Sequence, residues 1–158
     1  RGKQSGRTQE IQRLIGRSLR SVTNLQELGE RQIKIDCDVI QADGGTRTAS
    51  ISGGFVALYQ AIEKLKKNYN IQQRIIKNYV AAISVGIVDN KPCLDLDYKE
   101  DSAAQVDANF VICDNEKISE IQVTGEEFFF SSDQYQELYK LAQIGINQII
   151  SKQKSALE

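Results

Sequence analysis

Apolar residues recur at helical spacing in three parts of the chain. The spacing is three or four residues in 8–24, in 51–68 and in the stretch after Ser131, so the apolar side chains share one face of each segment. This pattern predicts three amphipathic helices. Ser131 and Gln134 have the spacing of a capping box, so the last helix is expected to begin there. Residues 1–7 show no periodicity, and we expect them to form a loop that carries positive charge.

Strand-like patterns fill the regions between these helices. Residues 32–39 alternate, which is typical of a half-buried strand. One face holds Ile33, Ile35, Cys37 and Val39, and the other holds Lys34, Asp36 and Asp38. Four further segments resemble strands, and the last two predict a hairpin: 79–88, 93–98, 108–113 and 117–125. The expected order is helix, strand, helix, four strands, helix. It predicts one α+β domain over residues 1–158, with a mostly antiparallel sheet and helices packed against it.

The length and the residue types limit the functions open to the chain. A chain of 158 residues has the usual size of one domain and can bury a real core. It contains no histidine, which excludes Ser-His-Asp and Cys-His catalysis and any histidine-ligated metal within this chain. Chemistry would have to use carboxylates, arginine, lysine or backbone N–H groups. No apolar run reaches the roughly 18–20 residues of a membrane span, so we expect no membrane partner.

The three cysteines predict a reducing environment. Cys37, Cys93 and Cys113 are widely spaced and odd in number, and none forms a C-x-x-C motif. Each lies in or beside a predicted strand, so we expect buried free thiols. This favours a cytoplasmic location.

Charge is distributed unevenly, although the net charge is only −1. Residues 1–34 hold eight Lys/Arg against three Asp/Glu, and residues 93–133 hold two Lys/Arg against eleven Asp/Glu. The basic region would suit a polyanion partner, and the acidic region would suit a cation or a proton-transfer site. Solvated surfaces produce the same division, so charge alone leaves both interpretations open.

A glycine-rich stretch, D-G-G-T-R-T at residues 43–48, lies between a predicted strand and a predicted helix. There the backbone N–H groups and the positive end of the helix would point to one place. The glycines allow an anion close to the backbone, Thr46 adds a hydroxyl donor, and Arg47 offers a bidentate fork for phosphate. The stretch lacks the G-x-x-x-x-G-K-[ST] pattern of a Walker loop. The spacing therefore allows either an anion site or a tight turn.

Two other groups of charged residues are candidates for chemistry. Asp101 and Asp107 lie at either end of a short connection between predicted strands, where both carboxylates could hold Mg²⁺ or one could act as a general acid. A run of basic residues near the amino end would suit contacts with a phosphate backbone: Arg1, Lys3, Arg7, Arg13, Arg17 and Arg20. An acidic surface turn and a solvated basic face explain the same residues.

Four long segments have unusual sequences: GRTQEIQRLIGRSLR (6–20), LGERQIKIDCDVIQADGGTRTASISGG (28–54), VAAISVGIV (80–88) and LDLDYKEDSAAQVDANFV (94–111). Together they resemble the ribonuclease PH family, the phosphate-dependent 3′-exoribonucleases of bacteria that trim tRNA 3′ ends. The resemblance runs from residue 1 to about residue 125 and, less closely, through the last helix. It implies a ribonuclease PH-like βαβ domain, Mg²⁺ as a cofactor, and a hexamer built as a trimer of dimers. It also favours the anion-site interpretation of the glycine-rich stretch.

The resemblance assigns expected roles to individual residues. The family binds its attacking phosphate through G-T-R and through an arginine before the first helix, and the matching residues here are Gly45, Thr46, Arg47 and Arg7. Two family aspartates associated with catalysis match Asp101 and Asp107, which would also be the metal ligands. An RNA substrate gives a group of basic residues an expected role in RNA binding: Arg1, Lys3, Arg13 and Arg17. The implied reaction transfers terminal nucleotides from tRNA and other RNA 3′ ends to inorganic phosphate.

The sequence departs from the family pattern in two places. About eighty residues that precede this region in the family are expected to be absent, and the first helix has no preceding strand to pack on. The segment VTGEEFFFSS (123–132) also differs from the family's G-T-A-E-x-x-x-F, and its three phenylalanines would suit the core, a subunit contact or a function. A non-catalytic RNA-binding or assembly subunit is therefore the alternative to the enzyme. A small-molecule phosphate binder would leave the basic residues unexplained.

Overall fold

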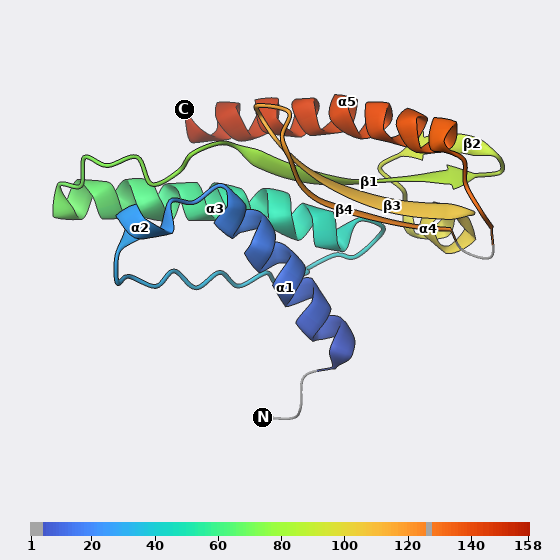
Figure 1. Cartoon of the computed structure of the whole chain (residues 1–158). Helices are drawn as coiled ribbons and strands as arrows, with labels where there is room; N and C mark the ends of the chain where they lie inside the picture. Colours follow the sequence, from blue (N-terminus) through green and yellow to red (C-terminus); the bar gives the residue numbers. More distant parts are fainter. Residues whose placement is uncertain (1–4, 126–127) are drawn as a thin grey trace.

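The computed structural model describes residues 5–125 and 128–158 of the chain. Helices and strands follow along these residues in this order (Figure 1): α1 (Gly6–Ser21), α2 (Leu25–Leu28), α3 (Thr46–Tyr69), β1 (Val80–Val88), β2 (Lys91–Leu94), α4 (Tyr98–Ala103), β3 (Val106–Cys113), β4 (Ile118–Gly125) and α5 (Ser132–Leu157). The predicted α+β class and the three long helices are confirmed. No helix in the described ranges combines the length and the apolar content needed to cross a membrane.

The first long helix begins earlier than its apolar pattern predicts. Ser5 caps α1, because its side chain accepts a hydrogen bond from the backbone N–H of Thr8. Gly6 and Arg7 therefore belong to the helix, and the expected loop is wrong for these two residues. α1 packs on α3, so the helix that lacked a preceding strand lies against another helix.

The ends of the other two long helices follow from local backbone conformation and capping. α3 begins after Gly45 and ends at Asn70, and both residues have left-handed backbone conformations. The predicted capping box of α5 is present, with hydrogen bonds in both directions between Ser131 and Gln134.

The four strands form one antiparallel sheet in the order β2-β1-β3-β4. α1 and α3 cover one face of this sheet, and α5 runs along the other (Figure 1). β1 and β3 lie in the middle of the sheet and are almost completely buried. A strand covered on both faces reads as a continuous apolar run, which explains the sequence of β1. β3 and β4 are the predicted hairpin.

Side chains of the two central strands alternate between two cores. On β1, Val80 and Ala82 pack with α1 and α3, whereas Ala81 and Ile83 pack with α5. Each core contains one fully buried phenylalanine, Phe55 on the α3 side and Phe110 on the α5 side. Of the three consecutive phenylalanines, Phe128 and Phe129 are exposed, whereas Phe130 packs at the edge of the α5 core.

Residues 32–39 do not form the predicted strand. Ile33 and Ile35 pack at the edge of the core beneath α1 and α3, while the polar residues between them are exposed, which explains the alternation. A strand also needs a neighbour that satisfies its backbone N–H and C=O groups. In the described part of the chain no strand pairs with this segment. The pattern therefore predicted partial burial correctly for Ile33 and Ile35, but wrongly for Cys37 and Val39, which are exposed, and it predicted strand pairing wrongly.

The region between Leu94 and Val106 also differs from the prediction. β2 ends at Leu94, and the expected connection between strands contains the six-residue helix α4. Leu96 is nearly fully buried, so the alternation over 93–98 again reflects one-sided burial. Asp97 starts α4 through a capping box with Glu100.

The cysteines are free, as predicted, but they are not buried. Cys37 is exposed, and Cys93 and Cys113 are partly exposed. Partial burial, followed by the nearby charge of Asp114, raises the pKa of the Cys113 thiol. This thiol therefore stays protonated at neutral pH, which makes it a poor nucleophile.

A single buried amide joins the two layers that cover the sheet. Gln153 of α5 is 4% exposed, and its Nε2 donates hydrogen bonds to Ser52 O of α3 (2.9 Å) and Val80 O of β1 (3.0 Å). Val80 is the first residue of β1, so the Gln153 side chain links α5 to α3 and to the start of β1.

We expect Gln153→Ala to lower the free energy of unfolding by about 1–3 kcal/mol, because it removes two hydrogen bonds made by a buried side chain. Urea denaturation followed by circular dichroism measures this loss. Gln148→Ala on the exposed side of the same helix is the matched control, with an expected change below about 0.5 kcal/mol. Equal effects of the two substitutions would contradict the bridging role.

Candidate active site at the amino end of helix α3

The turn before α3 lies directly against another part of the backbone. A Cβ added at Gly44 would lie 1.9 Å from Leu96 O, so only glycine fits this approach. Gly45, with φ 68°, then turns the chain into the helix, and Thr46 and Arg47 become its first two residues. The glycines therefore serve a tight turn that leads directly into the first turn of α3.

Asp43 connects this turn to α4. Its Oδ1 accepts hydrogen bonds from the backbone N–H of Gly44 (2.9 Å) and from that of Tyr98 (2.8 Å), the first residue of α4. The negative charge of the Asp43 carboxylate also interacts favourably with the positive amino end of α4. The turn before α3 and the helix that carries Asp101 are thus held in one relative position.

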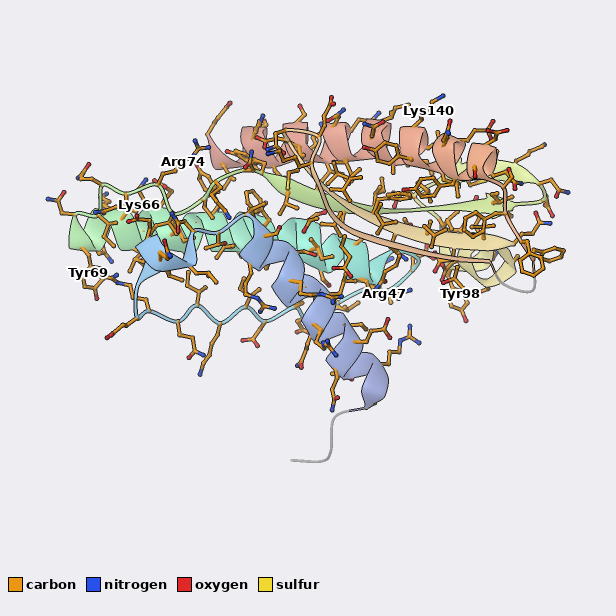
Figure 2. The ribbon with its side chains drawn as sticks, in the orientation of Figure 1. Arg47, Lys66, Tyr69, Arg74, Tyr98 and Lys140 are labelled. Carbon is orange, nitrogen blue, oxygen red and sulfur yellow. The ribbon has the colours of Figure 1, made fainter. Side chains whose placement is uncertain are left out.

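Arg47 and Asp107 are brought together across the space between α3 and the sheet. Arg47 Nη2 lies 4.0 Å from Asp107 Oδ2, with the two side chains 31% and 25% exposed. Figure 2 shows Arg47 at the amino end of α3, on the same side of the sheet as Tyr98 of α4. A long and partly exposed ion pair of this kind contributes only about 0–1 kcal/mol. The guanidinium and the first-turn N–H groups of α3 therefore provide donors next to a carboxylate.

The part of the sheet beneath this end of α3 is polar. Ser84 and Asn109 are cross-strand partners, and Gly86 and Asp107 are the next pair on the same face. This is the face that α3 covers, because the apolar residues earlier on β1 with the same alternation pack with α3. Ser84 and Asn109 are only 3% and 7% exposed. Ser84 Oγ accepts a hydrogen bond from the backbone N–H of Leu96 at 3.2 Å.

Asp101 does not share these contacts. It lies on the exposed surface of α4, and its carboxylate makes no hydrogen bond or ion pair with the residues in 5–125 and 128–158. Within these ranges, no group of three His, Cys, Asp or Glu residues could hold a metal ion. The joint binding of Mg²⁺ by Asp101 and Asp107 stays a prediction.

The predicted basic residues lie at different places along α1. Arg7 and Arg13 are exposed, and Arg7 is in the first turn, at the end of α1 that projects away from the sheet (Figure 1). Arg7 makes no hydrogen bond or ion pair with the described residues. Arg1 and Lys3 lie outside the described residues, so their predicted contacts with RNA are not placed.

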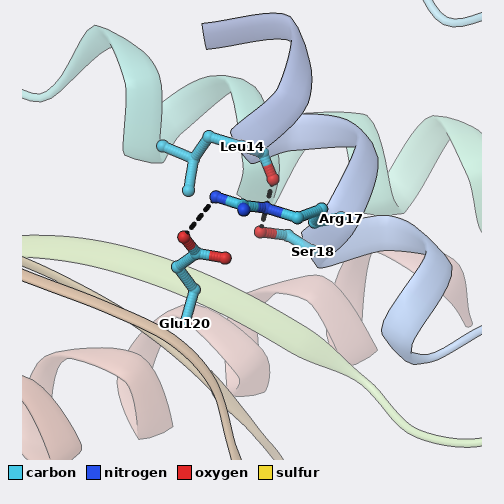
Figure 3. A network of polar contacts seen from close by, with 4 residues as sticks. All are labelled: Leu14, Arg17, Ser18 and Glu120. Carbon is cyan, nitrogen blue, oxygen red and sulfur yellow. Dashed lines mark hydrogen bonds and ion pairs between the residues drawn. The ribbon is translucent and has the colours of Figure 1, made fainter. Parts of the chain in front are cut away.

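Arg17 is occupied within the protein. Its Nη2 lies 2.6 Å from Glu120 Oε1 of β4 (Figure 3), and Ser21 of α1 bonds Ser119 of the same strand at 2.9 Å. These contacts attach α1 to the outer strand of the sheet. A contact between Arg17 and RNA would compete with this ion pair, and it stays a prediction.

The sequence matches two domains of one protein family. The 3′ exoribonuclease family, domain 1, matches residues 1–62, and domain 2 of the same family matches residues 78–145. The chain belongs to the 3′ exoribonuclease family. It is 57% identical to the Ribonuclease PH of Rhodospirillum rubrum over 157 residues and 58% identical to that of Neisseria meningitidis over 156 residues. Both alignments cover 99% of this chain, and they confirm the predicted family.

The chain is shorter than these 3′ exoribonuclease relatives. It spans 65% of the length of the Rhodospirillum rubrum protein and 64% of that of the Neisseria meningitidis protein. These shares say how much of each relative is matched, and they do not say which part of the relative is matched. They therefore do not support the expectation that about eighty residues are absent at the amino end.

Two solved structures have the same fold as this 3′ exoribonuclease family chain. Rice (Oryza sativa) Rrp46 has a TM-score of 0.71 at 16% identity, with 100% of this chain and 69% of that chain covered. The Archaeoglobus fulgidus exosome with RNA bound to the active site has a TM-score of 0.67 at 14% identity, with 96% and 63% covered. At these identities the similarity concerns the fold, and it confirms the predicted ribonuclease PH-like architecture.

Three polar residues of this site were not predicted from the sequence: Asp43, Ser84 and Asn109. Asp43 was part of the glycine-rich stretch, but its bond to Tyr98 depends on a helix that was not predicted. Ser84 and Asn109 interrupt the apolar runs of β1 and β3. A polar residue within such a run is a usable signal, because a doubly covered strand has little reason to bury one.

We expect Gly44→Ala to lower the free energy of unfolding by about 1–3 kcal/mol, because the added methyl group collides with Leu96 O. Gly53→Ala within α3 is the matched control, since a Cβ there meets no atom within 4 Å. Alanine is the better helix former, so this control is expected to raise stability by up to about 1 kcal/mol. Urea denaturation of both variants checks the opposite signs, and two stable variants would contradict the close approach.

Proposed function

We propose that the chain belongs to a phosphate-dependent 3′-to-5′ exoribonuclease that transfers the terminal nucleotides of RNA to inorganic phosphate. The observation that carries this proposal is the 4.0 Å separation of Arg47 and Asp107 at the amino end of α3. This contact supports the proposal, because a guanidinium that can bind phosphate lies beside a carboxylate that could take part in proton transfer or metal binding. Membership of the 3′ exoribonuclease family and identity above 55% to two proteins named Ribonuclease PH support the choice of reaction.

The attacking phosphate would be seated by the turn and the first turn of α3. Gly45 and Thr46 offer backbone N–H groups at the positive end of the helix, and Thr46 adds a hydroxyl donor. Arg47 supplies a guanidinium that replaces its weak contact with Asp107 by a bidentate contact with phosphate. Arg7 would be the second arginine of this set, as the family resemblance implies, and its side chain is exposed.

The reaction needs positioning and charge neutralisation more than covalent help from the protein. A phosphate oxygen attacks the phosphorus of the last phosphodiester, a new P–O bond forms, and the bond from phosphorus to the 3′-oxygen of the preceding nucleotide breaks. The products are a nucleoside diphosphate and an RNA one nucleotide shorter, whose 3′-oxygen takes up one proton. Asp107 would act as the general acid that delivers this proton.

Asp107 has a second possible role as a metal ligand, together with Asp101. Proteins often hold Mg²⁺ by one or two carboxylates, with waters and substrate phosphates completing the shell. In this role one ligand would come from exposed α4 and the other from the start of β3, and the family resemblance supports the pairing. Bound there, Mg²⁺ would neutralise negative charge on the phosphates.

The proposed substrates are tRNA and other RNA 3′ ends. The exposed Arg7 and Arg13 on α1 support an RNA partner, because exposed arginines on one helix suit contacts with a phosphate backbone. We also propose a homo-oligomer, a hexamer built as a trimer of dimers. The structural similarity to a protein described as an archaeal exosome core supports an assembly in general terms. The free cysteines support a cytoplasmic location.

Arg47→Ala is expected to raise the phosphate KM by roughly 10- to 100-fold, because a charge-assisted hydrogen bond to the nucleophile is lost. The assay incubates the chain with a 3′-extended tRNA and increasing phosphate, and it measures nucleoside diphosphates. Lys140→Ala removes an exposed charge from α5, on the other face of the sheet, and is the control. RNA binding without phosphate-dependent release would favour the non-catalytic subunit.

Asp107→Asn is expected to lower kcat by roughly 100-fold or more, because the amide cannot deliver a proton. Rates measured against pH and against Mg²⁺ concentration separate the two roles of Asp107. A general acid predicts that the variant loses the fall in rate at high pH, whereas a metal ligand predicts a raised Mg²⁺ requirement. An unchanged rate would exclude both.

A further inference from the structure

A largely buried asparagine, Asn109, lies on the sheet face beneath the site described above. Asn109 of β3 is 7% exposed and stands directly opposite Ser84 of β1. On the other side, its partner is Gln122 of β4. Asp107 is two residues earlier on the same strand, so the two side chains share a face and lie about 7 Å apart. Asn109 therefore belongs to the polar part of the face that α3 covers.

Asn109 as a whole residue is more than nine-tenths buried, and its side chain makes no hydrogen bond to the residues in 5–125 and 128–158, although its amide atoms are not among the fully buried atoms that lack a partner there. Buried amides in folded proteins almost always have a partner, which is protein, water or ligand. Ser84 beside it has such a partner, because its Oγ accepts the N–H of Leu96. The donor and acceptor of Asn109 are thus available to a bound molecule.

Groups that attract an anion lie on both sides of this amide. A Cβ at Gly45 would lie 3.7 Å from Ser84 Oγ, which places the start of α3 above the cross-strand partner of Asn109. Arg47 Nη2 lies 4.0 Å from Asp107 Oδ2, which places the guanidinium next to the strand neighbour of Asn109. An anion held by the amino end of α3 and by Arg47 would therefore lie next to the amide.

We propose that Asn109 is a further phosphate-binding residue, whose Nδ2 donates a hydrogen bond to an oxygen of the phosphate held by α3 and Arg47. The proposal rests on the proposed function, since it concerns the same site. A neutral amide suits this position, because a lysine or arginine would form an ion pair with Asp107. The bound oxygen belongs to inorganic phosphate or to a phosphodiester of RNA, and the two sources are tested separately.

The test compares Asn109→Asp and Asn109→Ala with Asn147→Asp, a control on the exposed surface of α5. Calorimetric titration with inorganic phosphate and anisotropy of a fluorescent single-stranded RNA measure binding without turnover. Asn109→Asp is expected to weaken binding by roughly 10- to 100-fold, because it replaces the donor by a repelling carboxylate. Asn109→Ala should weaken binding less, and Asn147→Asp should not change it. Weakened phosphate binding identifies the nucleophile as the ligand, whereas weakened RNA binding alone identifies the phosphodiester.

Urea denaturation separates this role from a structural one. Because the amide has no partner in the described residues, Asn109→Ala is expected to keep or increase the denaturation midpoint. A reduced midpoint with unchanged affinity for both ligands would assign Asn109 to packing and overturn the proposal. Absence of phosphate and RNA binding by the wild-type chain would overturn it as well. A wild-type chain that binds phosphate but releases no nucleoside diphosphate would contradict only the proposed enzyme.

Discussion

The packing of α3 across β1 and β3 is the constraint on which the site depends. Apolar residues along the helix, such as Phe55, cover the apolar part of one sheet face, and this contact fixes the direction and the end of the helix. Its amino end then lies above the polar part of the same face, where Ser84 and Asn109 are buried. A helix end holds unpaired N–H groups, so the same packing that stabilises the fold also directs donors toward polar side chains.

Stability and anion binding are separated between different parts of α3. In its second turn, the carbonyl of Ser52 accepts a hydrogen bond from Gln153 of α5, and the neighbouring Ile51 and Phe55 are buried. At its amino end, the contact between Arg47 and Asp107 is long and partly exposed. Weak contacts at a site are useful, because a ligand can replace them at little cost in folding free energy. The close approach of Gly44 to Leu96 holds the turn before α3 and does not depend on the contact between Arg47 and Asp107.

The basic residues of α1 show a similar division. Arg17 is committed to Glu120 and attaches the helix to the outer strand, whereas Arg7 and Arg13 are exposed. The sequence grouped all three, because they share charge and helix. Only the position of β4 distinguishes them, since it places a carboxylate within 2.6 Å of one and not of the others. A charge pattern therefore indicates a partner for a region, and the fold decides which residues remain available.

Local patterns predicted much of the fold because they depend on neighbours in the chain. The apolar spacing predicted the three long helices, the Ser131 capping box predicted the start of α5, and the strand patterns predicted β1, β3 and β4, whereas the segment predicted at 93–98 overlaps β2 only at Cys93 and Leu94. The strand expected at 32–39 is wrong, because alternation reports one-sided burial and a strand also needs a partner. α4 was missed because its six residues are too short to show an apolar period, although the Asp97–Glu100 capping box is a local signal for its start.

The sequence by itself determined the residue types of the site and their family, through G-G-T-R and the two aspartates. Only the tertiary structure decided which of them meet: Arg47 lies near Asp107, whereas the Asp101 carboxylate is exposed on α4. It also added Asn109, whose place beside Ser84 is set by the register of β1 and β3. The reason is that helix and turn signals act over a few residues, whereas a site joins side chains from distant segments through packing and strand register.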